Sequence, residues 1–472
     1  MTSALATRHR SGDEALRCDG VVWTFADLDD AAEDLAAALA LRQLGPGDRV
    51  GLHATTRLGT AAAVFALARR GIAVVALHPR LTAGEASALA ERAGVRCVLD
   101  DDAVDALRAE GRGASRSTEA TPSSGDAFAL LFTSGTSGTP KAAVLSHGAF
   151  VASAAASAAH LGWTPADRWI APLPLAHVGG LSMLTRCFLA RRPVTLLPRF
   201  DVGATLAAVR DGGTLLSVVP TMLRALLEAD DANVLSSLRV VLVGGAACPP
   251  DLLDACAARG VPAVATYGLT EMCSQVATEP VGAKVVGAPR GAGRALPGVE
   301  LRVLRVDGTD CAPGEAGSIV VRGPMRMDGY LGHTPLASSS YFDTGDTGVL
   351  DEAGALRVLA RRTDLVVTGG ENVYPAEVEH CLEAHPAVQQ AMVFGVPDAV
   401  WGQRVAALLV ARGAVDDEPA WRASVLDHLH ARLAGFKRPR LMARVASLPV
   451  LPSGKPDRAG AASSSASQLA PW

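Results

Sequence analysis

Short apolar runs that alternate with helical segments are the feature that most constrains how this 472-residue chain can fold. The runs are RVGLHA (49–54), IAVVAL (72–77), TLLSVVP (214–220), VVLVGG (240–245) and VPAVATYG (261–268). Ala- and Leu-rich helical patterns near 26–43 and 59–70 precede the first two runs. Buried strands that alternate with helices are typical of a mostly parallel sheet. The sequence therefore predicts an α/β fold.

The pattern of apolar and polar residues changes after about residue 285. Segments such as GVELRVLRVDG and GSIVVRGP alternate apolar and polar residues, which favours a small antiparallel portion. From residue 365 a compact region follows, with an amphipathic helix over 375–385, a second helix near 421–434 and a final strand, LMARVASLPV. The Ser/Ala-rich end, from residue 461, predicts a flexible tail.

Composition narrows the classes of protein that the sequence can encode. The hydrophobic fraction of 49% and the net charge of −4 disfavour a disordered chain and a basic nucleic-acid binder. The eight cysteines are scattered without a C-x-x-C pair, which favours reduced thiols over disulfides or a zinc site. The sequence begins without an apolar signal-peptide core and contains no spanning helix. We therefore expect a cytoplasmic protein that acts on neither membranes nor nucleic acids.

The segment LLFTSGTSGTPK (130–141) carries the strongest chemical signal. Its glycines allow the backbone to approach an anion closely, its serines and threonines supply hydroxyl donors, and Lys141 supplies a positive charge. Only four of the 44 basic residues are lysines, which adds weight to this one. An ordinary solvated loop is the alternative. The spacing differs from the common nucleotide loop G-x-x-x-x-G-K-[ST], so the segment predicts a phosphate-binding loop of another kind.

Four further segments carry weaker signals, and each has a structural alternative. TYGLTEM (266–272) offers an aromatic ring for a base and a carboxylate for magnesium, but an ordinary strand end explains it equally well. FDTGDTGVLDEAG (342–354) places Asp346 in a Gly-flanked turn that can bind ribose hydroxyls, and a β-hairpin turn is the alternative. Arg361 and Asp364, in ARRTDLVVTGGEN, suit a domain join or a salt bridge, and Lys455, in LPSGKPDR, can simply aid solubility.

Taken together and in order, TSGTSGTPK, YGLTE, TGD, RRTD…GGEN and SGK resemble the motifs of the adenylate-forming enzyme superfamily. This superfamily contains acyl-CoA synthetases, luciferases and the adenylation domains of peptide synthetases. The resemblance covers nearly the whole chain. It implies a large N-terminal domain over 1–363, built of layered α/β subdomains plus a small antiparallel portion. It also implies a small mobile α+β C-terminal domain over 364–460, with the tail at 461–472.

The resemblance also implies roles for individual residues. Those expected to bind ATP or CoA are Thr133, Ser134, Gly135, Thr136, Ser137, Gly138, Lys141, Gly244, Gly245, Ala246, Tyr267, Gly268, Asp346, Arg361, Gly369 and Gly370. Those expected to be catalytic are Lys455, Thr270, Glu271 and His177, with Glu271 also holding Mg²⁺ and Asp364 acting as the hinge. Lys455 would bridge the α-phosphate of ATP and the substrate carboxylate. Gly369 and Gly370 would line a tunnel for the CoA thiol.

Within the superfamily, HVGGLSMLTR, SVVPTMLRALL and GLTEMCSQ look most like the o-succinylbenzoate–CoA ligases of menaquinone biosynthesis. One departure is Ala176, where many relatives have an aromatic residue before His177. His177 would lie at the acyl pocket, although a packed histidine is the alternative. A second substrate carboxylate would need a cation, and Arg186 or Arg224 could supply it unless either forms a surface ion pair.

The resemblance thus predicts an acid–thiol ligase that forms AMP, with ATP, Mg²⁺ and coenzyme A as its cofactor and co-substrates. The expected reaction converts 2-succinylbenzoate into 2-succinylbenzoyl-CoA. A CoA ligase for another aryl or medium-chain acid, or an adenylating enzyme that loads a carrier protein, remains open. A nucleotide sensor without catalysis is less compatible with the presence of both Glu271 and Lys455. The resemblance leaves a homo-oligomer open.

Overall fold

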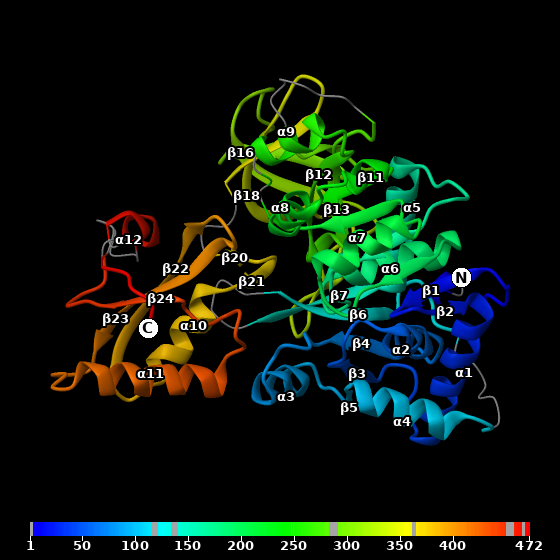
Figure 1. The fold of residues 1–472 in the computed structure, drawn as a ribbon, viewed down its shortest axis with the longest axis horizontal. Coiled ribbons are helices and arrows are strands. Elements are labelled where there is room, and N and C mark those ends of the chain that lie inside the picture. The colour runs from blue at the N-terminus through cyan, green and yellow to red at the C-terminus, as the bar shows by residue number, and fades with distance from the viewer. Residues whose placement is uncertain are drawn as a thin grey trace. The chain divides into compact units, whose positions relative to one another are not determined.

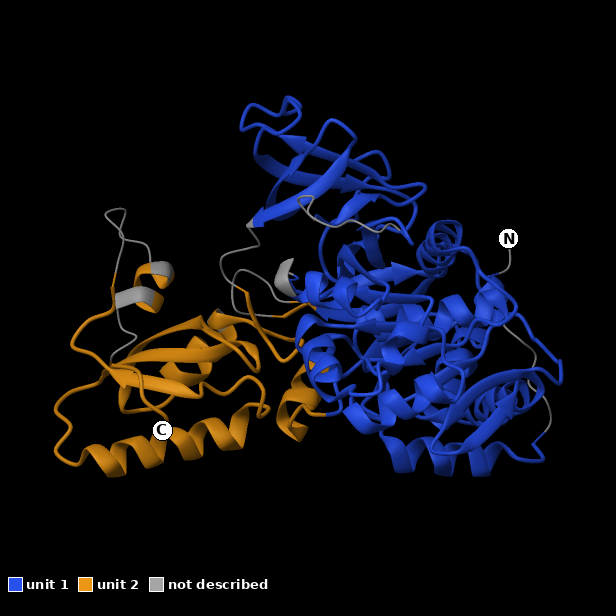
Figure 2. Ribbon diagram, turned by 45° about the horizontal axis from the view of Figure 1, so that its top comes forward, with its two compact units in different colours: residues 1–79, 90–132, 142–361 blue, residues 80–89, 133–141, 362–472 orange. Residues whose placement is uncertain are grey.

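A computed structural model of the chain describes residues 3–114, 121–133, 140–246, 248, 250–282, 291–360, 365–449, 457–464 and 468–472. Contacts between Cα atoms divide the chain into two compact units (Figure 2). The first unit comprises residues 1–79, 90–132 and 142–361, and the second comprises residues 80–89, 133–141 and 362–472. The domain boundary expected after residue 363 stays a prediction, because residues 361–364 lie outside the described ranges.

A large mixed sheet organises the first unit. In the described ranges its strand order is β15-β16-β18-β19-β14-β13-β12-β11-β10-β8-β9-β1-β2. Its parallel part contains β1 (Glu14–Cys18), β8 (Trp169–Ala171), β9 (Val194–Leu196), β10 (Leu215–Val218), β11 (Val240–Val243) and β12 (Ala263–Leu269), and β2 (Val21–Thr24) pairs antiparallel with β1. Its antiparallel part contains β13 (Ser274–Thr278), β14 (Gly293–Ala295), β15 (Glu300–Leu304), β16 (Gly317–Arg322), β18 (Phe342–Leu350) and β19 (Ala355–Ala360). The junction between the two parts falls at β12, where the Tyr267 motif lies.

A second sheet has the order β17-β7-β6-β4-β3-β5. Its strands are β3 (Arg49–Leu52), β4 (Ala73–Ala76), β5 (Cys97–Leu99), β6 (Ala127–Thr133), β7 (Lys141–Ser146) and β17 (Gly329–Tyr330). The strands β3, β4, β5 and β6 pair in parallel, and each of the four residues of β4 is buried. This burial explains why IAVVAL reads as a continuous apolar run.

Helices accompany these strands (Figure 1). They are α1 (Phe25–Leu41), α2 (Leu58–Arg69), α3 (Ala83–Arg92), α4 (Asp101–Gly111), α5 (His147–Leu161), α6 (Val178–Ala190), α7 (Val202–Arg210), α8 (Pro220–Ala229) and α9 (Pro250–Ala258), with 3-10 turns η1 (Ala4–Ala6), η2 (Val234–Ser237) and η3 (Thr270–Met272). Thr24 and Asp27 form a capping box at the start of α1, and the Ser146 hydroxyl caps α5. Helices α5 and α6 pack against each other and against β13.

The second unit has its own core. A sheet of β21 (Glu371–Val373), β20 (Val366–Thr368), β23 (Gly402–Ala411) and β22 (Val388–Asp398) also pairs with β24 (Leu441–Arg444). Helices α10 (Pro375–Glu383) and α11 (Glu418–Arg432) contribute Val378, Leu382, Val425 and Leu429 to that core, and α12 (Arg458–Ser464) follows. Pro375 occupies the first turn of α10, as the sequence predicts.

The fold class predicted from the sequence is confirmed: a large α/β part with an antiparallel portion is followed by a small α+β part. The end of the chain differs from the flexible tail that we expected. Ala461 is buried, Ala470 bridges to Met442, and the ring of Trp472 lies edge-on to Trp421 at 5.3 Å. The half-buried Trp472 ring thus packs against the core of the second unit. In the described ranges, every helix is too short or too polar to cross a bilayer.

Candidate active site

The predicted phosphate loop connects β6 to β7. Thr133 ends β6 and Lys141 begins β7, so both flanks of the loop are anchored in the second sheet. The Thr133 hydroxyl is buried and makes no hydrogen bond to any described residue. A buried hydroxyl of this kind is available to a ligand or to the loop itself. Ser134, Gly135, Thr136, Ser137 and Gly138 lie outside the described residues.

The Thr270–Glu271 motif lies on the tight turn η3, which joins β12 to the antiparallel strand β13. Glu271 is buried, and its Oε1 accepts a hydrogen bond of 2.6 Å from the Tyr330 hydroxyl. The backbone N–H of Met327 donates to the carbonyl of Glu271 at 2.8 Å. The first contact orients the carboxylate, and the second holds the backbone of the same residue.

A carboxylate in this setting fits a magnesium ligand. Mg²⁺ prefers oxygen ligands and is usually bound by one or two protein carboxylates together with phosphates and water. The Tyr330 hydroxyl occupies one acceptor position of Glu271, and a carboxylate has further acceptor capacity. Glu271 is therefore the described residue that we expect to hold the ion.

Tyr267 and Asp346 come together from β12 and β18. The phenol of Tyr267 donates a hydrogen bond of 2.7 Å to Asp346, and the ring is 1% exposed. The backbone N–H of Asp346 donates to the Thr344 hydroxyl at 3.1 Å. Gly268 allows a close strand crossing, because a Cβ there would lie 2.0 Å from the carbonyl oxygen of Ser274. The structure thus joins two motifs that are 79 residues apart in the sequence.

The glycines after β11 have a packing reason as well as a predicted binding role. A Cβ on Gly244 would lie 2.8 Å from a methyl group of Thr266, and Gly245 has φ +80°. Ala246 follows them directly. A residue with a side chain would separate β11 from β12 or strain the turn. The segment therefore keeps its backbone close to the end of β12.

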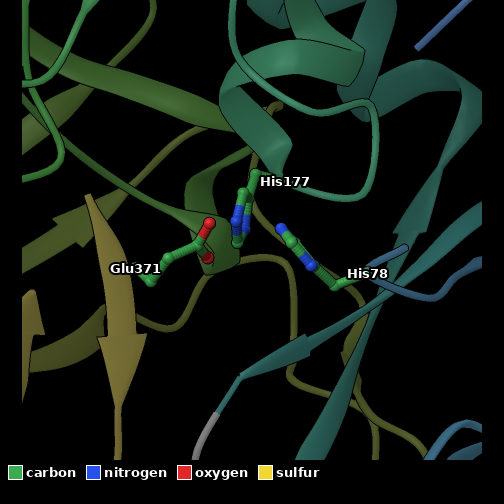
Figure 3. Close-up of side chains that lie close together, drawn as sticks. All are labelled: His78, His177 and Glu371. Carbon is green, nitrogen blue, oxygen red and sulfur yellow. The ribbon is translucent and has the colours of Figure 1, made fainter. Parts of the chain in front are cut away.

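His177 precedes α6 and occupies its N-cap position. Its ring lies 5.2 Å from the ring of His78, measured between centroids. Figure 3 labels both histidines, and its third labelled residue, Glu371, belongs to the second unit. The following Gly180 is required by packing, since a Cβ there would lie 2.1 Å from the Pro174 carbonyl oxygen.

Gly369 and Gly370 form the turn between β20 and β21 in the second unit. Their φ angles are +57° and +85°, and a Cβ on Gly369 would lie 2.8 Å from the Trp401 ring. Local backbone geometry thus accounts for both glycines, and their predicted role toward CoA stays a prediction. Arg361, Asp364 and Lys455 lie outside the described residues.

The two arginines considered for a second carboxylate differ in their surroundings. Arg186, on α6, is 3% exposed, and burial lowers its pKa to about 10. Among described residues it makes one hydrogen bond, from Nη2 to the Ser153 hydroxyl at 3.3 Å, and no salt bridge. Arg224 is only half-buried on α8. The alternative that Arg186 forms a surface ion pair is therefore wrong, because this side chain is buried and has no carboxylate partner among the described residues.

A family model described as AMP-binding enzyme matches residues 4–331, and a second, the AMP-binding enzyme C-terminal domain, matches residues 377–455. The chain belongs to the AMP-binding enzyme family. It is 36% identical over 453 residues to the 2-succinylbenzoate–CoA ligase of Bacillus licheniformis. The matched region covers 92% of this chain and 93% of the ligase.

Solved structures agree with this relationship. A double mutant of o-succinylbenzoate CoA synthetase from Bacillus subtilis, bound to a product analogue, superposes with a TM-score of 0.87 at 34% identity, over 95% and 94% of the two chains. The same synthetase in complex with its acyl-adenylate intermediate gives a TM-score of 0.72 at 33% identity, over 97% of each chain. The resemblance that we drew from motifs is thereby confirmed at the level of the family.

Two residues of this AMP-binding enzyme escaped the sequence motifs. Tyr330 contacts Glu271 from a two-residue strand, and Ser153 contacts the carbonyl of Cys273, at 2.7 Å, from an Ala-rich helix. The dipeptide GY (329–330) before a Gly-containing turn was the only local signal for the tyrosine. Nothing in the sequence around Ser153 distinguishes it from the other small residues of α5.

Proposed function

We propose that this chain is an ATP-dependent carboxylate–CoA ligase that converts 2-succinylbenzoate into 2-succinylbenzoyl-CoA through an acyl-adenylate, releasing AMP and pyrophosphate. The observation that supports the nucleotide part is the end of β12, where Tyr267 contacts Asp346 and, on the turn that follows, Glu271 contacts Tyr330. The choice of acid is supported by the likeness to 2-succinylbenzoate–CoA ligases, which extends over nine-tenths of the chain.

In the first step, a substrate carboxylate attacks the α-phosphate of ATP. Both reactants are anionic, so positive charge must offset their repulsion. We assign this task to Lys455, which would bridge the two groups, with Lys141 and the hydroxyls around Thr133 on the outer phosphates. The Asp346 carboxylate would accept hydrogen bonds from the ribose hydroxyls, and Arg361 would assist it. Tyr267 would pack beside the base. Glu271 would hold Mg²⁺, which would supply positive charge to stabilise the departing pyrophosphate.

In the second step, the CoA thiol attacks the acyl carbon and AMP leaves. We propose that the small C-terminal domain turns about Asp364 between the steps and withdraws Lys455. Gly369 and Gly370 then line the path of the thiol, because a side chain would obstruct the pantetheine arm. Closure of the site protects the adenylate from hydrolysis.

The proposed substrate carries two carboxylates, and one of them stays unreacted. We assign Arg186 as its partner, since a guanidinium buried without a carboxylate among described residues is costly unless a ligand supplies the counter-charge. His177 begins the helix that carries Arg186, and we propose that it lines the acyl pocket. Arg224 is the weaker choice because it is more exposed.

The test of this function is pyrophosphate exchange that depends on the carboxylic acid, followed by detection of the CoA thioester. The panel contains 2-succinylbenzoate, benzoate and octanoate. We expect exchange and thioester only with 2-succinylbenzoate. Activity confined to benzoate or octanoate would refute the assigned acid while keeping an acyl-CoA synthetase. Exchange without any thioester, even with CoA present, would instead favour an enzyme that loads a carrier protein.

The cell compartment and partners complete the proposal. All eight cysteines are free thiols, which suits a reducing compartment, and ATP and CoA are abundant in the cytoplasm. We propose that the enzyme works there on small molecules alone, without nucleic acid or membrane. Fractionation of cells and mass measurement of the purified protein would test the location and reveal any homo-oligomer.

A further inference from the structure

Two consecutive residues directly after the Thr270–Glu271 turn hold a backbone conformation that side chains disfavour. Cys273 has φ +51° and ψ +43°, and Ser274 has φ +95°. Neither is glycine, so each conformation is costly and persists only where surrounding contacts enforce it. The N–H of Cys273 donates to the Thr270 carbonyl at 3.0 Å, which ties this backbone to the turn.

The enforcing contact comes from α5. The hydroxyl of Ser153 donates a hydrogen bond of 2.7 Å to the carbonyl oxygen of Cys273, the atom that lies between the two strained residues. Ser153 is 3% exposed and Cys273 is fully buried, so water does not compete for this bond.

A second contact sets the direction of the Ser153 proton. Arg186 Nη2 donates to the Ser153 oxygen at 3.3 Å. A guanidinium can only donate, so the serine must accept from it and use its single proton elsewhere. The proton therefore points at the Cys273 carbonyl. A cation on α6, a hydroxyl on α5 and a carbonyl before β13 form one chain of hydrogen bonds.

We infer that Ser153, oriented by Arg186, is a positioning residue for adenylation: it holds the Cys273–Ser274 peptide and thereby the turn that presents Thr270 and Glu271. Tyr330 fixes the Glu271 carboxylate from one side, and Ser153 fixes the backbone that follows it from the other. Loss of the hydroxyl lets both strained residues relax toward negative φ, which displaces Glu271. The inference rests on the proposed function for its kinetic readout only.

The chain provides a matched control. Ser157 lies one turn further along α5, is fully buried, and donates to the side chain of Gln275 at 2.9 Å. The substitution Ser157→Ala removes a comparable hydrogen bond from the same packing layer without touching Cys273. It is expected to lower the melting temperature about as much as Ser153→Ala does.

The experiment compares wild type, Ser153→Ala, Ser157→Ala and the double variant Ser153→Ala/Ser274→Gly. We expect adenylate formation in Ser153→Ala to fall about tenfold in kcat, because small displacements of catalytic groups are costly. Binding of Mg·ATP, measured by calorimetry without any acid, should weaken in the same variant. Ser157→Ala should match wild type in both. In the double variant, Ser274→Gly should bring adenylate formation and Mg·ATP binding back toward the wild-type values, because glycine accepts φ +95° without strain.

Equal losses in the two serine variants, or no rescue by Ser274→Gly, would overturn the inference. If Ser153→Ala does not fold, the double variant decides: folding with activity supports the inference, and failure to fold contradicts it. A crystal structure of Ser153→Ala with Ser274 still at positive φ would also refute it. Wild type that binds Mg·ATP but ignores 2-succinylbenzoate would instead count against the proposed function, since the binding comparison needs no acid.

Discussion

The phenol of Tyr267 holds the carboxylate of Asp346 through a hydrogen bond of 2.7 Å, although the two residues belong to strands of opposite parts of the large sheet. Tyr267 ends the parallel series, and Asp346 lies on an antiparallel strand. The bond orders the carboxylate before any nucleotide arrives. Preorganisation of this kind lowers the entropy that binding must otherwise offset.

We expect Tyr267→Phe to raise the KM for ATP about tenfold and to change kcat much less. The substitution removes a hydrogen bond to a charged group, which contributes about 1.5–3 kcal/mol, and leaves Asp346 to be ordered by the ligand. Initial rates at varied ATP provide the measurement. Tyr341→Phe is the control, because this phenol also donates to a carboxylate, Glu300 on the terminal strand β15, at 2.8 Å. Equal effects of the two substitutions would contradict the assigned ribose site.

The hydroxyl of Tyr330 gives a separate prediction about magnesium. Tyr330→Phe should leave the fold intact and raise the Mg²⁺ concentration needed for half-maximal adenylation, because the Glu271 carboxylate loses the donor at 2.6 Å that orients it. Outer-shell partners of metal ligands typically contribute about tenfold or more in affinity. Titration of activity with MgCl₂ at saturating ATP measures the shift. An unchanged Mg²⁺ requirement would show that Glu271 does not hold the ion.

The sequence predicted those parts of the molecule that depend on local pattern. Continuous apolar runs became buried parallel strands, as at Val240–Val243, because strands covered on both faces lack polar alternation. The motif residues Tyr267, Thr270 and Glu271 fall at the end of such a strand, as expected. Their contact with Asp346 follows from sheet order, which no local pattern encodes.

The contacts that could not be predicted from the sequence depend on how strands and helices pair in the folded protein. Tyr330 reaches Glu271 because β17 pairs with β7, and Ser153 reaches Cys273 because α5 packs on β13. Small residues in an Ala-rich helix carry no periodic signal that would distinguish one serine. The contact of Trp472 with Trp421 was missed because the Ser/Ala-rich composition of the last residues is typical of a flexible tail.

Replacement of Arg186 separates stability from recognition. We expect Arg186→Met to keep or raise the melting temperature, because an apolar side chain removes an uncompensated buried cation. The same variant should lose at least about a hundredfold in kcat/KM for 2-succinylbenzoate, since removal of one partner of a buried ion pair costs about 3–5 kcal/mol. The matching control is an analogue that lacks one carboxylate and remains a substrate, for which the loss should be smaller. Equal losses for both acids would remove Arg186 from substrate recognition.

Lys455 should act in one half-reaction only. We expect Lys455→Ala to lower the rate of adenylate formation at least about a hundredfold, because the charge that joins the two anions is lost. Thioester formation from the preformed adenylate and CoA should proceed at the wild-type rate. Lys284→Ala, at another of the four lysines, serves as the control and should leave both half-reactions unchanged. A normal rate of adenylation in Lys455→Ala would refute the proposed mechanism.

Acid should destabilise the fold through His147. Its imidazole is fully buried, its Nδ1 lies 2.8 Å from the Ser3 hydroxyl, and burial lowers its pKa from 6.5 to about 4. Between these values the unfolded chain binds a proton that the folded protein does not, so the free energy of unfolding falls as the pH decreases from 6.5 to about 4. The loss is on the order of 3 kcal/mol. Urea unfolding of wild type and His147→Gln across this range measures it. The difference between the two profiles isolates this residue, since the carboxylates and His385 titrate in both proteins, and parallel profiles would show that His147 does not contribute.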